Sequence, residues 1–319
     1  MLRVDKKECI SALLAAIVSF FAYQTGLFFF LFMIPLQLLV FKSGIRVAKI
    51  AMLGVGVSLV YLGIKNTAGV TDPEIKKILL LLEFAVPCLL MGGFLMMNNT
   101  AGRNPNVLRN IFVATVLTAG FSVLIFSLAR NGVIEEHFRA NFASMLNTLK
   151  SSMENTGSYE LVPLMNMDAD SMLEMVSTVF YRGYLFAYFC ILFLTYTFAM
   201  SIDKLTKHQC SIITVEVPDL FVWVLVAALG TVLLDSRFPL GAAGYLGWNV
   251  FLIIMFLYGL RGLSIIRQIF EARKVPAFLR FIITLIFVSM LMSPGIGRLL
   301  LIAIPCIGIA EVWFKYKRT

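Results

Sequence analysis

The sequence predicts an all-α, polytopic membrane protein whose spans pack as a helix bundle. Hydrophobic residues make up 60% of the 319-residue chain and charged residues only 14%, whereas about a quarter of the residues in a soluble domain are charged. Apolar segments recur along most of the chain, and several reach the roughly 20 residues that span about 30 Å of hydrocarbon. The basic residues form short clusters between these segments, as topology signals do.

Ten segments qualify as candidate spans, and the pattern allows between eight and ten crossings. In chain order they are 10–23, 26–41, 45–64, 78–97, 107–129, 176–200, 220–234, 243–263, 278–292 and 299–314. The first two are short, and only three residues (24–26) interrupt them. One long tilted helix, or a helix with a re-entrant piece, is therefore an alternative for residues 10–41. We expect the whole chain, 1–319, to form a single integral membrane domain.

The charge distribution predicts the orientation. With ten spans and both termini in the cytoplasm, 18 of the 27 lysine and arginine residues fall on the inner side, the bias that cytoplasmic loops show. We therefore expect a bacterial inner-membrane protein with both ends inside. The net charge of +9 could also indicate nucleic acid, but the basic residues are not gathered on one polar domain. We expect no nucleic-acid partner.

Two segments outside the spans have the periodicity of amphipathic helices. The first lies in the long acidic outer loop, 130–175, and serves either as a lid over a binding site or as a simple connector. Its apolar positions are Ile134, Phe138, Phe142, Met145, Leu149 and Met153. Ser171 and Glu174 then fit a capping box at the start of the next helix. The second segment, 264–277, has a basic face and ends at Pro276, which predicts an interfacial helix on the cytoplasmic side.

Ionisable groups within spans are the first candidates for function, because a charge in hydrocarbon is expensive. Glu83 lies six residues beyond Lys77, or about 9 Å deeper along a helix. Pro87 and the glycine pair at 92–93 follow and would allow a bend beside a polar cavity. An internal hydrogen bond that fixes helix packing is the alternative role for Glu83.

Further polar residues complete the candidate sites. Asn98, at the end of the same segment, and Arg298, in the outer turn SPGIGR, join Glu83 as candidate substrate-binding residues. Arg261 and Glu311 fall near the cytoplasmic ends of their spans, where they either pair or anchor the helices at the interface.

No pattern of a known catalytic site occurs in the chain. HExxH, Walker A, GxSxG and GxGxxG are absent, and the two histidines, His137 and His208, fall in predicted loops on opposite sides of the membrane. The five cysteines have no CxxC spacing, so no zinc site is indicated. We expect neither enzymatic activity nor a cofactor, and energy from ATP would have to come from another chain.

Three stretches carry a family resemblance: IPLQLLVFKSGIRVAKIA, GLRGLSIIRQIFEARKVPAFLR and LIAIPCIGIAEVWFKYKR. They resemble the YybS-like family of bacterial membrane proteins, whose domain has no known function, and the likeness spans nearly the whole chain. That family usually has an Asp before the terminal aromatic pair and an acidic residue after it, where this chain has Glu311 and Lys315. Its N-terminal part looks distantly like the substrate-binding subunits of energy-coupling-factor transporters. Those subunits engage a transmembrane coupling protein through an alanine-x-x-x-alanine row, which Ala12 and Ala16 match.

Two functions are compatible with these observations. The first is a solute-binding or transport subunit, in which a small-molecule solute contacts Glu83 in a pocket open to the outside, and an ATPase and a coupling membrane subunit act in trans. The second is a non-transporting scaffold that recruits cytoplasmic or envelope-building partners through Arg267, Arg273 and Lys274. The lipid bilayer is a partner in both, and an intramembrane enzyme is a third, weaker alternative.

Overall fold

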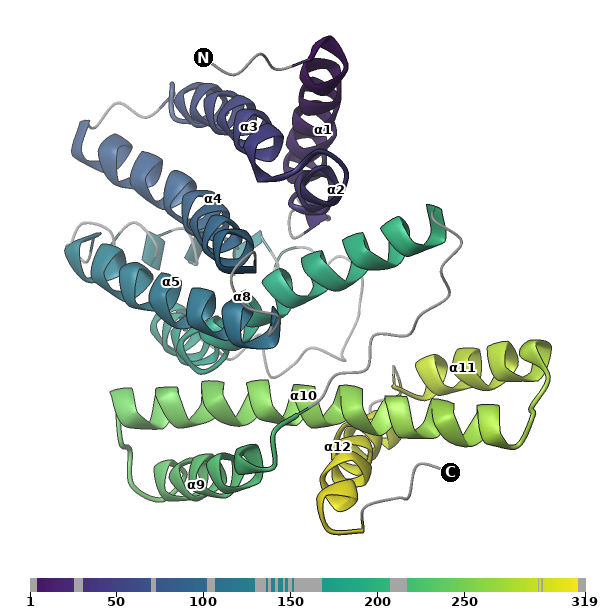
Figure 1. The fold of residues 1–319 in the computed structure, drawn as a ribbon. Helices are drawn as coiled ribbons and strands as arrows, with labels where there is room; N and C mark the ends of the chain where they lie inside the picture. The colour runs from purple at the N-terminus through teal and green to yellow at the C-terminus, as the bar shows by residue number, and fades with distance from the viewer. Residues whose placement is uncertain are drawn as a thin grey trace. The chain divides into compact units, whose positions relative to one another are not determined.

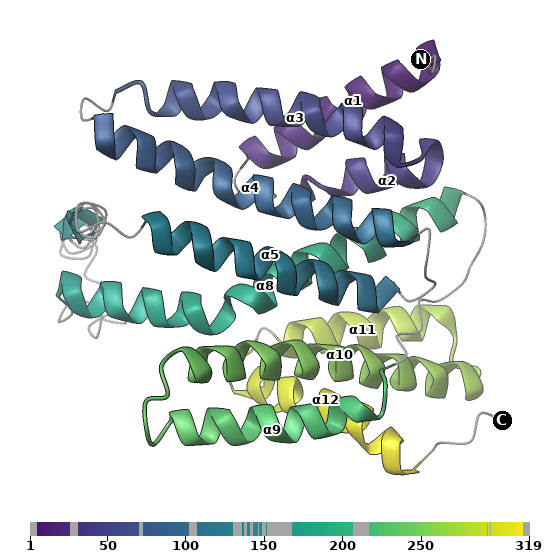
Figure 2. The same cartoon turned by 60° about the vertical axis from the view of Figure 1, so that its left-hand side comes forward.

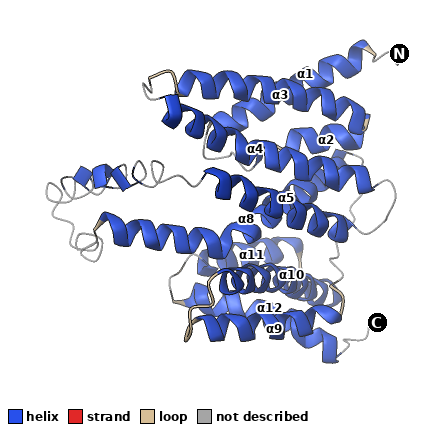
Figure 3. Ribbon diagram, turned by 90° about the vertical axis from the view of Figure 1, so that its left-hand side faces the viewer, coloured by secondary structure: helices blue, strands red, loops and turns tan. Residues whose placement is uncertain are grey.

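The computed structural model describes residues 5–25, 31–69, 73–101, 107–129, 168–206, 217–291, 293 and 295–314, together with nine positions between 136 and 151. Helix is the only kind of regular element that these residues form (Figures 1 and 3). This confirms the predicted all-helical class. The helices group into two compact units, residues 1–210 and 211–319, where the sequence predicted one domain.

The first unit contains α1 (Lys6–Gln24), α2 (Ile34–Ser43), α3 (Ile45–Asn66), α4 (Pro73–Ala101), α5 (Val107–Ala129) and α8 (Ala169–Thr206). α1 packs against α2 and α3, while α4 packs against α3 and α5, as Figure 2 shows. α8 lies against α5 and α2. The core of this unit includes the fully buried side chains of Leu36, Leu90, Phe94, Ile111, Phe189 and Leu192.

The second unit contains α9 (Leu220–Asp235), α10 (Ala242–Ala272), α11 (Ala277–Leu291) and α12 (Ile296–Phe314). α10 is its central helix and packs along both α9 and α12. Val222 and Leu225 of α9 form a buried cluster with Ile254 and Tyr258 of α10. α11 packs against α12 and has no buried residue.

Local sequence explains the sharp corner between α2 and α3. Pro35 lies in the first turn of α2, where its missing N–H would have no helical partner anyway. Gly44 follows the last residue of α2 with a φ of 85°, a conformation that is favourable only for a residue without a Cβ. The chain therefore turns within one residue, and α3 begins at Ile45.

Six helices are long and apolar enough to cross a membrane: α1, α3, α4, α8, α10 and α12. Shorter apolar helices lie at Ile34–Ser43, Leu108–Phe121, Leu220–Asp235 and Ala277–Leu291 within the residues searched. Each of the ten predicted segments thus contains a described helix. Several helices of membrane-spanning length and composition are confirmed, and ten crossings stay a prediction.

The predicted second span, 26–41, differs most from the structure. α2 begins only at Ile34 and has ten residues, which reach about 15 Å, or half the hydrocarbon thickness. α1 ends at Gln24 and packs against α2, so one long helix over residues 10–41 is excluded. A helix followed by a short second piece, the remaining alternative, fits these two helices.

The residues predicted as a separate interfacial helix, 264–277, belong mainly to the end of α10. This helix runs unbroken for 31 residues, or about 46 Å, which exceeds the roughly 30 Å of the hydrocarbon. Lys274, with a φ of 50°, lies in the turn that follows, and Pro276 precedes the first residue of α11. The boundary thus differs from the prediction, whereas the interfacial position of these residues stays a prediction.

The predicted outer loop, 130–175, is described only in part. Met145 is exposed, and the described positions between 136 and 151 are helical. The other five apolar positions of the predicted amphipathic helix lie outside the described residues: Ile134, Phe138, Phe142, Leu149 and Met153. The predicted capping box is wrong, because Ser171 lies inside α8 and its backbone N–H donates to Oδ1 of Asp168 at 2.9 Å. Hydrogen bonds from Ser171 lower the pKa of Asp168.

Candidate functional site

Glu83 of α4 is held in place by a side chain of α3. Nδ2 of Asn66, the last residue of α3, donates to Oε1 of Glu83 at 2.9 Å. One turn earlier, Gly63 lies so close to α4 that a Cβ there would stand 3.2 Å from Oε2 of Glu83 and 2.6 Å from the ring of Phe84. The missing side chain of Gly63 therefore lets α3 approach α4 at the carboxylate, which is partly buried.

A third helix contributes Tyr23, near the C-terminal end of α1, whose phenol interacts electrostatically with Glu83. We call Tyr23, Asn66 and Glu83 the polar cluster. Because Tyr23 and Asn66 both lie where their helices end, the polar cluster sits at one end of α1 and α3. α4 extends about 15 Å further, back to Pro73. Glu83 is thus within its own helix but level with the end of α3.

Asn98 forms a separate polar contact near the other end of α4. Its amide exchanges two hydrogen bonds with Gln37 of α2, at 2.9 and 3.0 Å, and Nδ2 also donates to the carbonyl of Phe94 at 2.9 Å. Gln37 is fully buried. Asn98 lies 15 residues from Glu83, or about 22 Å along the helix. The two predicted substrate-binding residues therefore do not belong to one small-molecule site.

Arg298, the third predicted substrate-binding residue, belongs to the second unit. It is exposed in the first turn of α12. The preceding Gly297 is packed tightly, since a Cβ there would stand 2.3 Å from the carbonyl oxygen of Leu291. Arg298 therefore lies at the start of α12, just after the turn that joins α11 to α12.

The second unit contains a mostly buried ion pair between α10 and α12. Arg261 donates through Nε and Nη2 to the two carboxylate oxygens of Glu311, the Nη2 bond measuring 2.7 Å, and the two side chains are only 15% and 19% exposed. Of the two predicted roles, pairing is the one observed. Nearby glycines let the helices approach, because a Cβ on Gly308 would stand 2.2 Å from the carbonyl oxygen of Tyr258.

The alanine row of α1 packs inside the chain. Ala12 is only 2% exposed, and a Cβ on Gly54 of α3 would stand 3.4 Å from that of Ala16. Ala16 therefore faces α3 and Ala12 is buried within the first unit, whereas their role as partner-binding residues stays a prediction. The opposite face of α1 is apolar and exposed through Ile10, Leu13, Leu14, Ile17 and Phe21.

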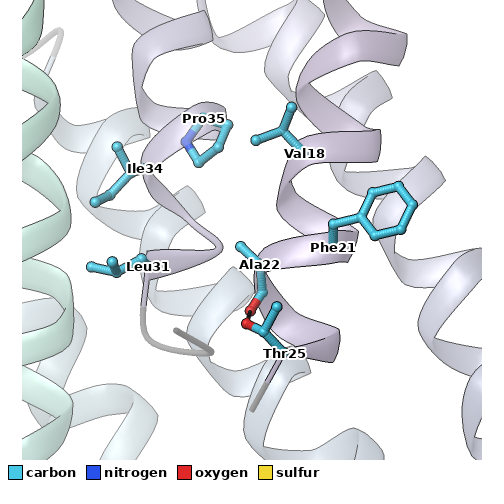
Figure 4. A pocket seen from close by; sticks show the side chains of 7 residues that line it. All are labelled: Val18, Phe21, Ala22, Thr25, Leu31, Ile34 and Pro35. Atoms are coloured by element: carbon cyan, nitrogen blue, oxygen red, sulfur yellow. Dashed lines mark hydrogen bonds between the residues drawn. The ribbon is translucent and has the colours of Figure 1, made fainter. Parts of the chain in front are cut away.

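A cavity of about 490 Å³ lies between α1 and α2 (Figure 4). Val18, Ala22 and Pro35 are among the apolar side chains that line it. Its one side-chain hydroxyl, from Thr25, already donates to the carbonyl of Ala22 at 2.8 Å. The cavity therefore suits an apolar group and offers a polar solute little to bind.

The three basic residues of the scaffold hypothesis lie near the α10–α11 turn. Arg267 pairs with Glu271 at 3.1 Å, whereas Arg273 and Lys274 are exposed in the turn itself. Within the described residues, no three His, Cys, Asp or Glu side chains lie close enough together to hold a metal ion.

Sequence reasoning missed the partners of the polar residues that it selected. Asn66 and Tyr23 both lie at helix ends and gave no signal of their own. Gln37 did give one, since it is a single amide within the apolar run IPLQLLVF. A buried amide needs a hydrogen-bonding partner, and Asn98 is the one that the fold supplies.

The helices and their contacts define the class: an integral membrane protein with several apolar helices in contact with lipid. A family model described as "Predicted membrane protein (DUF2232)" matches residues 9–310. The chain belongs to this family of unknown function, which confirms the predicted membership. No curated protein and no solved structure matches the chain, and the distant likeness to energy-coupling-factor subunits is not supported by these comparisons.

Proposed function

We propose that the protein is a solute-binding subunit of a membrane transport system and that the polar cluster is its recognition site. The observation that carries this proposal is the carboxylate of Glu83, fixed by Asn66 and close to Tyr23. An ionisable residue in a membrane helix is costly to maintain, and this one accepts a hydrogen bond from Asn66 at the end of α3. Such a position is reachable from the water beside the membrane.

The chemistry of the polar cluster defines the class of solute. A carboxylate accepts hydrogen bonds and attracts positive charge, while the amide of Asn66 and the phenol of Tyr23 can both donate and accept. We therefore propose a small solute that carries an amine or several hydrogen-bond donors. One oxygen of Glu83 accepts from Asn66, and the solute would bond to the other.

Energy in this proposal comes from an ATPase and a coupling membrane subunit in trans. Ala12 is buried within the first unit and Ala16 faces α3, so the coupling subunit would bind elsewhere. The exposed apolar face of α1, defined above, offers a surface of suitable character.

Native mass spectrometry of protein extracted from its own membranes in mild detergent tests the proposal. The wild-type protein should retain a small metabolite of reproducible mass, and Glu83→Gln should lose it because the neutral amide neither attracts a cation nor accepts as strongly. Glu174→Gln is the matched control, since Glu174 is an exposed acid of α8 in the same unit. Equal retention by wild type and Glu83→Gln would remove Glu83 from the site, and no retained metabolite in any variant would count against the function.

The scaffold hypothesis remains the second candidate function, and the exposure of Arg273 and Lys274 in the turn after α10 favours it. Replacing Arg267, Arg273 and Lys274 with glutamine should release a co-purifying protein partner from the membrane fraction. An unchanged set of co-purifying proteins would argue against this candidate.

A further inference from the structure

A groove of about 470 Å³ lies between the end of α10 and the start of α11, within the second unit. The two helices run side by side here, as Figures 1 and 2 both show. Its volume is within the range of about 300–1,000 Å³ that ligand pockets occupy. The groove is amphipathic, because two arginines, Arg267 and Arg280, share it with phenylalanine and isoleucine side chains.

The two arginines converge on one anionic position. Nε of Arg267 lies 3.1 Å from Oε1 of Glu271, and Nη1 of Arg280 lies 3.9 Å from the same oxygen. Nε of Arg280 also donates to the carbonyl of Val275 at 2.8 Å, which orients its guanidinium. Two positive charges face one carboxylate, so this trio has a net charge of +1. It is therefore matched to one more negative charge, such as that of a phosphodiester.

The rest of the groove is apolar and continues away from the α10–α11 turn. Phe270 lies near the turn, while Leu263 of α10 and Phe287 of α11 lie about two turns deeper along their helices. Thr284 lies between these ends, but its hydroxyl already donates to the carbonyl of Arg280 at 2.8 Å. The deeper part thus offers contact with hydrocarbon, and a free phosphate ion would leave it unfilled.

α11 has the character of a helix that faces lipid. None of its residues is buried, and Phe278, Phe281, Leu285 and Ile286 are all more than half exposed. Arg273 and Lys274 add two exposed positive charges in the adjoining turn. Between residues 264 and 291 the sequence has four basic residues and one acidic residue, and basic residues beside the bilayer attract anionic headgroups.

We infer that this groove binds one anionic phospholipid of the surrounding bilayer. The phosphodiester lies between Arg267 and Arg280, where guanidinium groups form charge-assisted hydrogen bonds to phosphate oxygens. An acyl chain follows the groove toward Leu263 and Phe287. The site is separate from the polar cluster of the first unit and does not depend on the proposed function.

Native mass spectrometry of the full chain tests this inference by titrating delipidated protein with phosphatidylglycerol or with phosphatidylcholine. The wild-type protein should retain one phosphatidylglycerol molecule in preference to phosphatidylcholine. Arg267→Gln and Arg280→Gln should each weaken this binding by about fivefold, given the usual contribution of one basic residue near anionic lipid. Arg298→Gln is the control, since Arg298 is exposed and does not line the groove.

Glu271→Gln gives a second test that keeps both arginines. Removing the carboxylate that competes for them should tighten phosphatidylglycerol binding, because the groove then has a net charge of +2. Equal binding of the two lipids by the wild type would overturn the inference, as would weaker or unchanged binding by Glu271→Gln. Displacement of the lipid by equimolar inorganic phosphate would assign the site to a free anion, and displacement by an acidic peptide would assign it to a protein partner.

Discussion

At the scale of single residues, the ion pair of Arg261 and Glu311 links α10 to α12 in the second unit. Both side chains are mostly buried, and the guanidinium meets the carboxylate with two hydrogen bonds. Removing one residue of a buried ion pair leaves the other charge buried without a partner. This destabilises the fold more than replacing both residues with apolar ones. This asymmetry makes the pair testable.

Arg261→Gln should lower the free energy of unfolding by about 3–5 kcal/mol, because Glu311 is left buried and unpaired. The double variant Arg261→Met with Glu311→Leu should recover most of that loss. Thermal unfolding in detergent, followed by the helical circular dichroism signal, measures both. Arg267→Gln is the control, since its pair with Glu271 is exposed and such pairs contribute about 1 kcal/mol or less. Equal effects of Arg261→Gln and Arg267→Gln would contradict this account.

The amide pair of Gln37 and Asn98 separates helix packing from solute recognition. Asn98→Ala should destabilise the protein by about 1–3 kcal/mol, because the buried amide of Gln37 loses its partner. Retention of a co-purified metabolite should be unaffected, since Asn98 lies far along α4 from Glu83. Melting curves and native mass spectra of the same preparation give the two readouts. Loss of the metabolite without loss of stability would return Asn98 to the binding site.

At the scale of elements, glycines set how closely α10 and α12 approach. A Cβ on Gly308 would stand 2.2 Å from the carbonyl oxygen of Tyr258 and 3.0 Å from the backbone nitrogen of Gly262. Backbone atoms cannot rotate away as the end of a side chain can, so the helices themselves would have to separate.

Gly308→Ala should therefore cost about 1–3 kcal/mol, the usual penalty of overpacking. Gly259→Ala is a matched control on the same contact, because a Cβ there would meet Cγ of Pro305 at an ordinary 3.6 Å. Alanine is also the better helix former by about 1 kcal/mol, so this control should be neutral or stabilising. Melting temperatures of the two variants measure this difference, and a Gly308→Ala protein as stable as Gly259→Ala would contradict the close approach of α10 and α12 at Gly308.

The start of α8 provides a prediction about pH. Hydrogen bonds from Ser171 lower the pKa of Asp168, so the folded helix favours the carboxylate. The stabilisation is present above the ordinary aspartate pKa, about 3.9, and is lost as the pH falls through the lower folded value. Asp168→Ala should speed amide exchange in the first turn of α8 at neutral pH, whereas Asp168→Asn should keep most of the cap. A difference between wild type and Asp168→Ala that persists well below pH 3.9 would contradict this cap.

The elements were largely predictable from the sequence, whereas their contacts were not. Runs of apolar residues located the described helices, because hydrocarbon requires apolar side chains and complete backbone hydrogen bonding. The apolar run at 26–41 was predicted to be a full span, because hydropathy does not distinguish the short helix α2 from a membrane-spanning helix. Glu83 and Asn98 were selected as unusual residues within an apolar segment, but their partners Asn66 and Gln37 depend on which helices meet. That information is non-local, as are the burial of Ala12 and the contact of Ala16 with α3.

At the scale of the whole molecule, the proposed solute site depends on how the chain crosses the membrane. The proposed solute site requires the C-terminal ends of α1 and α3 to face the outside, and the positive-inside bias places the α10–α11 turn in the cytoplasm. Ten crossings with both termini inside satisfy both conditions.

The most direct measurement is labelling of single cysteines in whole cells with a membrane-impermeant maleimide, after replacement of the five native cysteines. Gly69→Cys probes the end beside the polar cluster, and a Cβ there meets no other atom within 4 Å. Arg273→Cys probes the exposed turn after α10. Position 69 should be labelled in intact cells, and position 273 only after permeabilisation. The reverse pattern, or labelling of both positions from one side, would contradict a solute site that opens to the outside.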